Sequence, residues 1–505
     1  MALKSKLDSN DTSLAYAEES SIGVISAPTW YRLNPNSYND FGGEITIVAP
    51  TPITNTRQRD KGVTTDLDAS GGFNHNLSNT NLRDLMQGFM FADERTTTQV
   101  ALTGAASGVY TLADTSALAV GDWVRITGFA NAENNVGGRI SALTLNTDIT
   151  LSGVTPLDET IASTATLAGV RATAGDLDID ASGTLPVMTS TTVDFTALDI
   201  EAGSWVYIGG DAAGSVFANA ENNGFKRVKS VDSATQITFD KSDSAMVTEA
   251  STTETIDLFY GSMLKNESTP ANIVRRTYHL ERILGAPDDA SSDVQSEVIE
   301  GATPSEMVIN IPQAALANVD MNFIGVDNSQ YTAGNELQSS VQEFESTDII
   351  NTSSDFSRLK MAIYVAGSEA PSDLFAYITE ATITINNNLS PNKAVATLGA
   401  FDITAGTFSV TAQVTAYFVE TAAVAAVRNN SDVTFDFIMA KDNRGVVLDL
   451  PLVALGDGRL SVELDAPITL PLSMDAATAS KLDSTNLDFT AAFTFFDYLP
   501  DVASA

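Results

Sequence analysis

The sequence predicts a mainly β protein that is built from several domains and contains a few short helices. One observation that carries this prediction is a set of short runs in which apolar and polar residues alternate. They include residues 44–48, 307–311, 382–385 and 408–418. Such alternation is typical of half-buried strands, because successive side chains point to opposite faces of a sheet. A chain of 505 residues is also too long for one ordinary core, so two to four domains are expected.

The second observation is an internal repeat. A Gly-x-Trp-Val-x-Ile strand begins at Gly121 and again at Gly203, and each copy leads into Phe-Ala-Asn-Ala-Glu-Asn-Asn, at 129–135 and at 217–223. Seven consecutive identities do not arise by chance, so two tandem β modules are predicted, at residues 96–170 and 171–256. Trp123 and Trp205 are predicted to anchor the cores of these modules, with an exposed carbohydrate platform as the alternative.

The segments on either side of the modules lack the repeat and share long strands. The simplest account is that both modules are inserted into one host region, because surface loops whose ends lie close together tolerate insertions. Helical periodicity is sparse. It is clearest over residues 79–91, where apolar residues recur at spacings of three and four, and two shorter candidates are 421–427 and 476–482.

The composition excludes several classes of function. The chain has 64 acidic and 27 basic residues, for a net charge of -37, of which the modules carry -12 and the rest -25. A chain with so few lysines and arginines is a poor candidate for tight binding to nucleic acid or for docking on anionic lipid. The lack of cysteine excludes disulfides, thiolate zinc sites and cysteine nucleophiles. No stretch resembles a signal peptide or approaches the ~18 apolar residues of a membrane helix, so a soluble protein folded in a cytoplasm is expected.

No catalytic or metal-binding constellation stands out, and we predict no enzyme, cofactor or metal. His75 and His279 are the two histidines, about two hundred residues apart. Asp176, Asp178 and Asp180 alternate like the start of a calcium loop, but Ala181 stands where that loop needs glycine. The phosphate-loop and Gly-x-Ser-x-Gly motifs are absent from the sequence.

The segment 20–95 carries a more specific pattern. It contains Trp-x-x-Leu-x-Pro-Asn-Ser from Trp30, Ile-x-x-x-Arg-Gln from Ile53, Lys-Gly-x-x-Thr-Asp-Leu-Asp-Ala-Ser from Lys61, and a short helix from Leu82. In these motifs the sequence resembles the tail tube (major tail) proteins of long-tailed, non-contractile bacteriophages. The resemblance covers 20–95 well and 257–505 more loosely. It leaves out the repeat modules, which in related tails look outward and decorate the tube.

The resemblance implies tail-tube-type β-sandwich or barrel domains, duplicated in this chain. Residues 1–95 and 257–355 would form the first tube domain and residues 356–505 the second, because the roughly 340 residues outside the modules suffice for two domains of about 150. Three chains would then make a ring with pseudo-sixfold symmetry, which we favour. A homohexamer with a single tube fold per chain is the alternative.

The resemblance also implies a structural role in the virion tail, assembled in the host cytoplasm. Rings would stack into a hollow tube through which double-stranded DNA passes during ejection without specific binding. The implied partners are other copies of the chain, a tape-measure protein, and tail-terminator and tail-tip proteins.

A channel for DNA is expected to be lined by acidic and hydroxyl side chains, which do not hold phosphates. The candidate lining strands lie within 305–327 and 402–420. The lumen-lining candidates are Glu306, Asp320, Asp402 and Glu420. An outer-surface position of these acids is the alternative.

The loop region 40–75 is the candidate for contact between rings. The ring-stacking candidates are Arg57, Arg59, Lys61, Asp66 and Asp68. Their cations are expected to meet acids of the next ring, and a locally paired loop is the alternative.

Two other functions remain open from the residues alone. A surface adhesin with repeated β modules would fit the composition, although the missing export signal and the 25–90 pattern count against it. A carbohydrate hydrolase lacks any placed constellation beyond generic acids.

Overall fold

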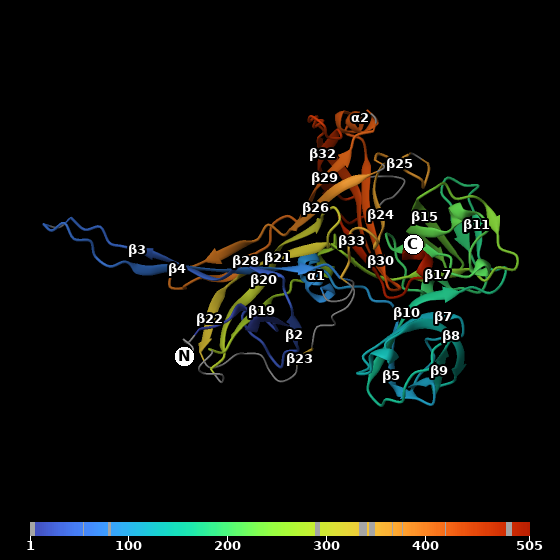
Figure 1. The fold of residues 1–505 in the computed structure, drawn as a ribbon, viewed down its shortest axis with the longest axis horizontal. Helices are drawn as coiled ribbons and strands as arrows, with labels where there is room; N and C mark the ends of the chain where they lie inside the picture. The colour runs from blue at the N-terminus through green and yellow to red at the C-terminus, as the bar shows by residue number, and fades with distance from the viewer. Residues whose placement is uncertain are drawn as a thin grey trace.

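The computed structural model describes residues 6–53, 55–78, 82–287, 293–332, 341–342, 349–365, 367–375, 377–419, 421–480 and 487–504. Their strands form an 18-stranded sheet, a 13-stranded sheet and a two-stranded sheet. The prediction of a mainly β fold is therefore confirmed. Figure 1 shows a central body, two round modules on one side of it, and a long two-stranded arm on the other.

We call the 18-stranded sheet the wall. Its strands are β1 (Ser13–Glu18), β2 (Trp30–Leu33), β3 (Ser37–Val48), β4 (Val63–Asn76), β18 (Ser262–Lys265), β19 (Tyr278–Gly285), β20 (Gln295–Ile311), β21 (Asn318–Gly325), β22 (Asp327–Thr332), β23 (Val341–Gln342), β24 (Phe356–Ile363), β25 (Ser372–Asp373), β26 (Ile378–Asn386), β29 (Ser409–Tyr417), β30 (Val433–Lys441), β31 (Arg444–Asp457), β32 (Thr469–Ala477) and β33 (Ala492–Phe496). A continuous antiparallel path runs β3-β4-β21-β20-β26-β29-β32-β31-β30-β24.

Alternation along the wall strands produces one apolar and one polar face. On β20, Met307, Ile309 and Ile311 are buried, whereas the residues between them are partly exposed. The same period of two holds on β21, β26, β29 and β32. The apolar side chains of these strands share one core.

Two helices cover this core. Helix α1 (Arg83–Met90) buries Leu85, Met86 and Phe89, and helix α2 (Ala422–Asn429) buries two alanines. They confirm the helices predicted within 79–91 and near 421–427. The helix predicted over 476–482 is corrected, because 476–477 complete strand β32 and 478–480 are not helical, while 481–482 lie outside the described residues.

The 13-stranded sheet holds both modules. Its strands are β5 (Gln99–Ala106), β6 (Val109–Leu112), β7 (Asp122–Thr127), β8 (Gly137–Thr144), β9 (Asp148–Leu151), β10 (Ser163–Arg171), β11 (Asp178–Asp180), β12 (Val187–Thr189), β13 (Trp205–Ile208), β14 (Gly224–Ser233), β15 (Gln236–Ser242), β16 (Glu249–Ala250) and β17 (Asp257–Tyr260). Strands β5–β10 surround one apolar core and β11–β17 another. Strand β17 pairs with β10 and with β13, so it joins the two modules.

The arm is the outer part of the β3–β4 hairpin, residues 44–68, and it projects far from the body (Figure 1). At its base lies the two-stranded sheet of β27 (Ser390–Lys393) and β28 (Ala400–Thr404). Lys393 bonds to Asp66 and Asp68 of β4 at 2.5 and 2.6 Å, which fastens this small hairpin to the arm.

Candidate functional surfaces: a polar face, an arm and a module junction

The polar face of the wall is ordered into three rows of side chains that cross the strands side by side. The first row consists of Ser37, Asn74, Asp320, Val308, Thr384, Thr411 and Asp475. The second row consists of Asn76, Asn318, Asn310, Thr382, Gln413 and Ser473. The third row consists of Asn39, Gly72, Asn322, Glu306, Asn386 and Ser409.

Apart from Val308 and Gly72, these rows consist of amides, hydroxyls and acids, and they contain no lysine or arginine. The amides hold the acids in place: Asp320 accepts hydrogen bonds from Asn74 at 2.9 Å and from Asn310 at 3.0 Å. Glu306 likewise accepts one from Asn386 at 2.8 Å. The face is thus a hydrogen-bonded amide and hydroxyl surface with fixed negative charges.

The predicted lining acids are distributed unevenly. Glu306 and Asp320 lie on the polar face, whereas Asp402 lies on β28 in the two-stranded sheet. Glu420 lies outside the described residues. The sequence reasoning missed Asp475, and also Glu380, which lies opposite Thr415 and accepts its hydroxyl hydrogen bond at 3.1 Å. The alternation around 380 and 475 would have placed both acids on the same face, had the strand register been known.

The arm separates the predicted stacking residues into two groups. Asp66 and Asp68 are paired within the chain, with Lys393. Arg57, Arg59 and Lys61 are exposed at the tip, and none of them bonds to another part of the chain that the structure describes. With Asp60 as the only acid among residues 49–63, the tip has a charge of +2 in a chain of net charge -37.

The arm also exposes an unusual number of large apolar side chains. Ile47, Val48 and Val63 are 64%, 52% and 65% exposed, and Ile53 at the tip is fully exposed. The hairpin at the base adds Val395 and Phe401. An isolated two-stranded ribbon is at best marginally stable in water, so an arm of this kind needs a surface to pack on.

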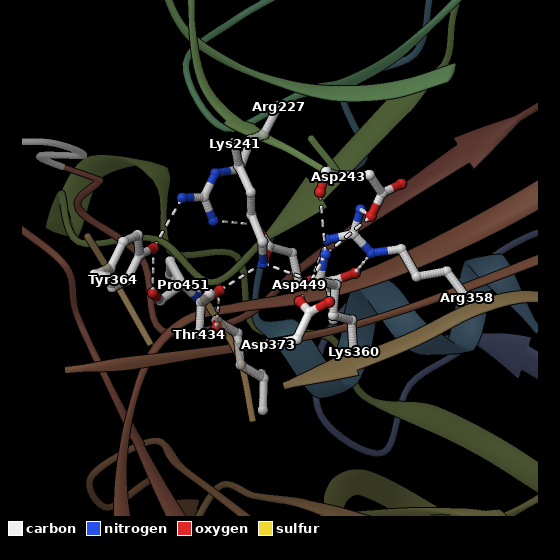
Figure 2. A network of polar contacts seen from close by, with 12 residues as sticks. Arg227, Lys241, Asp243, Arg358, Lys360, Tyr364, Asp373, Thr434, Asp449 and Pro451 are labelled. Atoms are coloured by element: carbon white, nitrogen blue, oxygen red, sulfur yellow. Dashed lines mark hydrogen bonds and ion pairs between the residues drawn. The ribbon is translucent and has the colours of Figure 1, made fainter. Parts of the chain in front are cut away.

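A third surface is the junction between the second module and the wall (Figure 2). Arg227 on β14 donates to Asp240 and to Asp449 of β31, both at 2.8 Å. Lys241 on β15 lies 2.5 Å from Asp436 of β30. These charged groups are almost completely removed from solvent.

Arg358 of β24 completes the network by pairing with Asp436 at 2.6 Å. Arg227, Lys241 and Arg358 then face Asp240, Asp436 and Asp449, so the charges of these buried side chains balance. Burial lowers the pKa of Lys241 and raises that of Asp240, whereas Arg358 and Lys241 outweigh burial and hold the pKa of Asp436 below its usual value. Removing any one of these side chains would leave the buried set with an uncompensated charge.

Both repeat tryptophans pack outside the module cores, Trp205 against the wall and Trp123 against Tyr498 and β17, which corrects the sequence prediction. Trp205 is 1% exposed and packs in a cluster with Phe225 of β14 and Phe496 of the wall. Trp123 is half-buried, stacks on Tyr498 with ring centroids 5.0 Å apart, and donates from Nε1 to Asp257 at 3.0 Å. The sequence identified both as packing residues but had no information about which partner they pack against.

The seven-residue repeat is a carboxylate-binding loop in both modules. In the first, Glu159 accepts hydrogen bonds from the backbone of Ala130 and Asn131 and from the amide of Asn134. In the second, Glu249 accepts the equivalent bonds from Ala218, Asn219 and Asn222. The last Asn of each loop, 135 or 223, closes it by bonding to the backbone of the first Phe. The repeat therefore has a structural explanation within each module.

A comparison with protein-family models matches the phage tail tube protein family twice, over residues 9–258 and 246–491. The chain belongs to the phage tail tube protein family. The match confirms the resemblance seen in the sequence, and its two copies confirm that the tube fold is duplicated. The first copy runs through the modules, and the two matches meet next to β17. No curated protein matches the chain.

The protein is accordingly a structural component of the virion tail that is assembled in the host and associates with copies of itself. No helix among the described residues is long and apolar enough to cross a membrane. The same residues contain no group of His, Asp and Glu side chains arranged to hold a metal ion.

Proposed function

We propose that this protein polymerises as stacked rings into the hollow tail tube, with the polar face of the wall lining a channel for double-stranded DNA. The observation that carries the proposal is the set of three cross-strand rows without a cation. The opposite face of the same strands is filled by the apolar core, so the polar face is the one left for water or a passing polymer.

The chemistry of these rows suits transport of DNA without binding. Proteins hold DNA mainly by replacing its counterions with lysine and arginine, and this face offers neither. Its acids repel phosphates that approach within about a Debye length, roughly 8 Å at physiological salt. Asn, Thr and Ser keep the surface hydrated between the acids. The duplex would therefore slide past without being held.

Labelling of assembled tubes tests which face lines the channel. The chain has no cysteine, so single cysteines can be placed at Thr411 on the polar face and at Leu145, which is 74% exposed on the first module. A maleimide on a polymer too bulky to enter the tube should label both variants before assembly. After assembly it should label only L145C. Full labelling of T411C in intact tubes would exclude the lining role.

We propose a trimeric ring with pseudo-sixfold symmetry, supported by two family matches in each chain. A homohexameric ring remains the alternative. The mass of isolated rings, or the symmetry of tubes imaged by electron cryo-microscopy, decides between three and six chains. The further proposed partners are a tape-measure protein and the tail-terminator and tail-tip proteins, and we propose no enzymatic activity.

We propose that the arm contacts the next ring along the tube. Its exposed apolar side chains support this role, as do its tip cations, which bond to no other residue that the structure describes. Charge reversal at Arg57 and Arg59 should leave the subunit folded, since both side chains are exposed and bond to no other described residue. It should shorten or abolish the tubes seen by negative-stain microscopy. Full-length tubes from that variant would exclude a stacking role for the tip.

A further inference from the structure

A groove lies at the edge of the wall where β20 ends and β26 begins. Its cavity of about 220 Å³ is lined by apolar side chains that include Ile311, Leu359 and Ile378. Tyr377 is 71% exposed at its mouth, and Glu380 forms part of its rim. Protein interfaces combine an aromatic and apolar centre with a polar rim. An exposed tyrosine beside apolar side chains and an acid therefore suits a segment that is both apolar and basic.

The strand register places this groove at the opposite end of the wall from the arm. Strand β4 begins at the arm tip with Val63 and ends at Asn76, which pairs with Asn318 just after the β20–β21 turn. That turn contributes residues 312–314 to the groove. A single chain thus presents a projecting arm at one end of its sheet and a receiving groove at the other.

The arm tip and the groove are complementary in chemistry. The tip offers the fully exposed Ile53 and a charge of +2, and the groove offers apolar walls and the carboxylate of Glu380. Two complementary surfaces on opposite ends of one molecule produce a heterologous, head-to-tail contact, which repeats without closing along an axis. This is the geometry that a stack of rings requires.

We propose that the groove bounded by Ile311, Tyr377 and Glu380 receives the arm tip of a second copy of this chain in the adjacent ring. The inference rests on the proposed function, since it takes stacked rings as given, and it specifies the surface on which the arm lands. The apolar residues of the arm, exposed in the single chain, then become buried on assembly and favour the contact between rings.

Disulfide trapping tests the contact in a chain that has no cysteine of its own. Cysteines would be placed at Ile53 in the arm tip and at Gln313, an exposed residue of the groove. Oxidation of assembled tubes should produce a ladder of covalent oligomers on a non-reducing gel. The matched control joins I53C to L145C on the first module and should produce no ladder. Each single-cysteine variant should stop at dimers or below.

The outcomes separate the groove from the tube itself. If tubes form but the I53C/Q313C pair yields no ladder, the groove assignment is overturned and the tube proposal stands. If the unmodified protein forms no tubes under any condition, the proposed function is wrong, and the groove assignment that rests on it is overturned as well. Should the double variant fail to assemble, density for the arm tip in a cryo-microscopy map of unmodified tubes decides, because it must lie against Tyr377 and Glu380 or the proposal is wrong.

Discussion

The two modules share a motif and differ in how they meet the tube wall. In the second module, Trp205 and the pair Arg227 and Lys241 are buried against β30 and β31. In the first, Trp123 is only half-buried and reaches the rest of the chain through Tyr498 and Asp257. The two copies of the duplicated unit thus differ in attachment: the second module is packed against the wall through buried aromatic and charged side chains, and the first is held by fewer and more exposed contacts.

The largest expected effect comes from breaking the buried network of the second module. Replacement of Arg227 by Met removes the partner of two buried acids, and we expect a loss of about 3–5 kcal/mol in the free energy of unfolding. Denaturant unfolding of the subunit measures this loss. Arg139 of the first module is the matched control, because it is half-buried and makes no ion pair with other described residues. R139M should change stability by less than about 0.5 kcal/mol.

This network is an example of a contact that could not be predicted from the sequence. Alternation predicted strands, the repeat predicted two similar modules, and periodicity of three and four predicted both α-helices of the described residues, along with a third that these residues do not contain, because those signals are local. Nothing in the sequence indicates that Arg227 of one module meets Asp449 of the wall, 222 residues later. Such a pair depends on how two separate sheets pack on each other, and neither periodicity nor spacing encodes that.

Substitution of the two tryptophans should also destabilise the second module more than the first. The difference between the two losses of unfolding free energy should be smaller than for the two arginines. Trp205→Ala would leave a cavity between the second module and the wall and should cost about 3–5 kcal/mol. Trp123→Ala removes a partly exposed ring and should cost about 1–3 kcal/mol. Thermal unfolding of the two variants gives the comparison. Equal losses would mean that the first module is fixed to the body as firmly as the second.

The polar face teaches a related lesson. The alternating pattern predicted that Glu306 and Asp320 are partly exposed on long strands, and the structure puts both on one face. The pattern could not exclude Asp402 from the polar face of the wall. The strand that carries Asp402 also alternates, but it pairs with β27 and not with the wall. Long-range pairing determines which sheet a strand joins and which face of that sheet its side chains occupy. The residues of the strand itself do not determine either.

The stability of the first module should depend on pH in a way that the stability of the second does not. Asp122 of the first module stands where Ser204 stands in the second, next to the repeat tryptophan. Burial raises the pKa of Asp122 from 3.8 to about 6, despite a hydrogen bond from the backbone of Ala119. Between pH 3.8 and about pH 6, the folded state therefore keeps a proton on Asp122 that the unfolded state has already released. The stabilisation, at most about 3 kcal/mol, is present below pH 4 and is lost as pH rises through 6.

Hydrogen exchange of peptides from β7 and β8 between pH 4 and 7.5, corrected for the intrinsic exchange rate, measures this effect locally. The first module should lose protection as pH rises, and D122S should remove the trend because serine does not titrate. The second module provides the internal control, since its equivalent residue is Ser204. A first module with pH-independent protection would mean that Asp122 stays ionised in the folded protein.

The smallest difference is expected where the modules are most alike. Glu159 and Glu249 each accept several hydrogen bonds from the Asn-rich loop, and Gln would turn an acceptor oxygen into a donor that faces those same amides. We expect E159Q and E249Q each to cost about 1–3 kcal/mol, and to differ from each other by less than either differs from the unmodified protein. Exchange protection of residues 129–135 and 217–223 reports the loss directly. If only one loop loses protection, the repeat would have to serve a second purpose in the other module, since an identical carboxylate clamp predicts the same response in both.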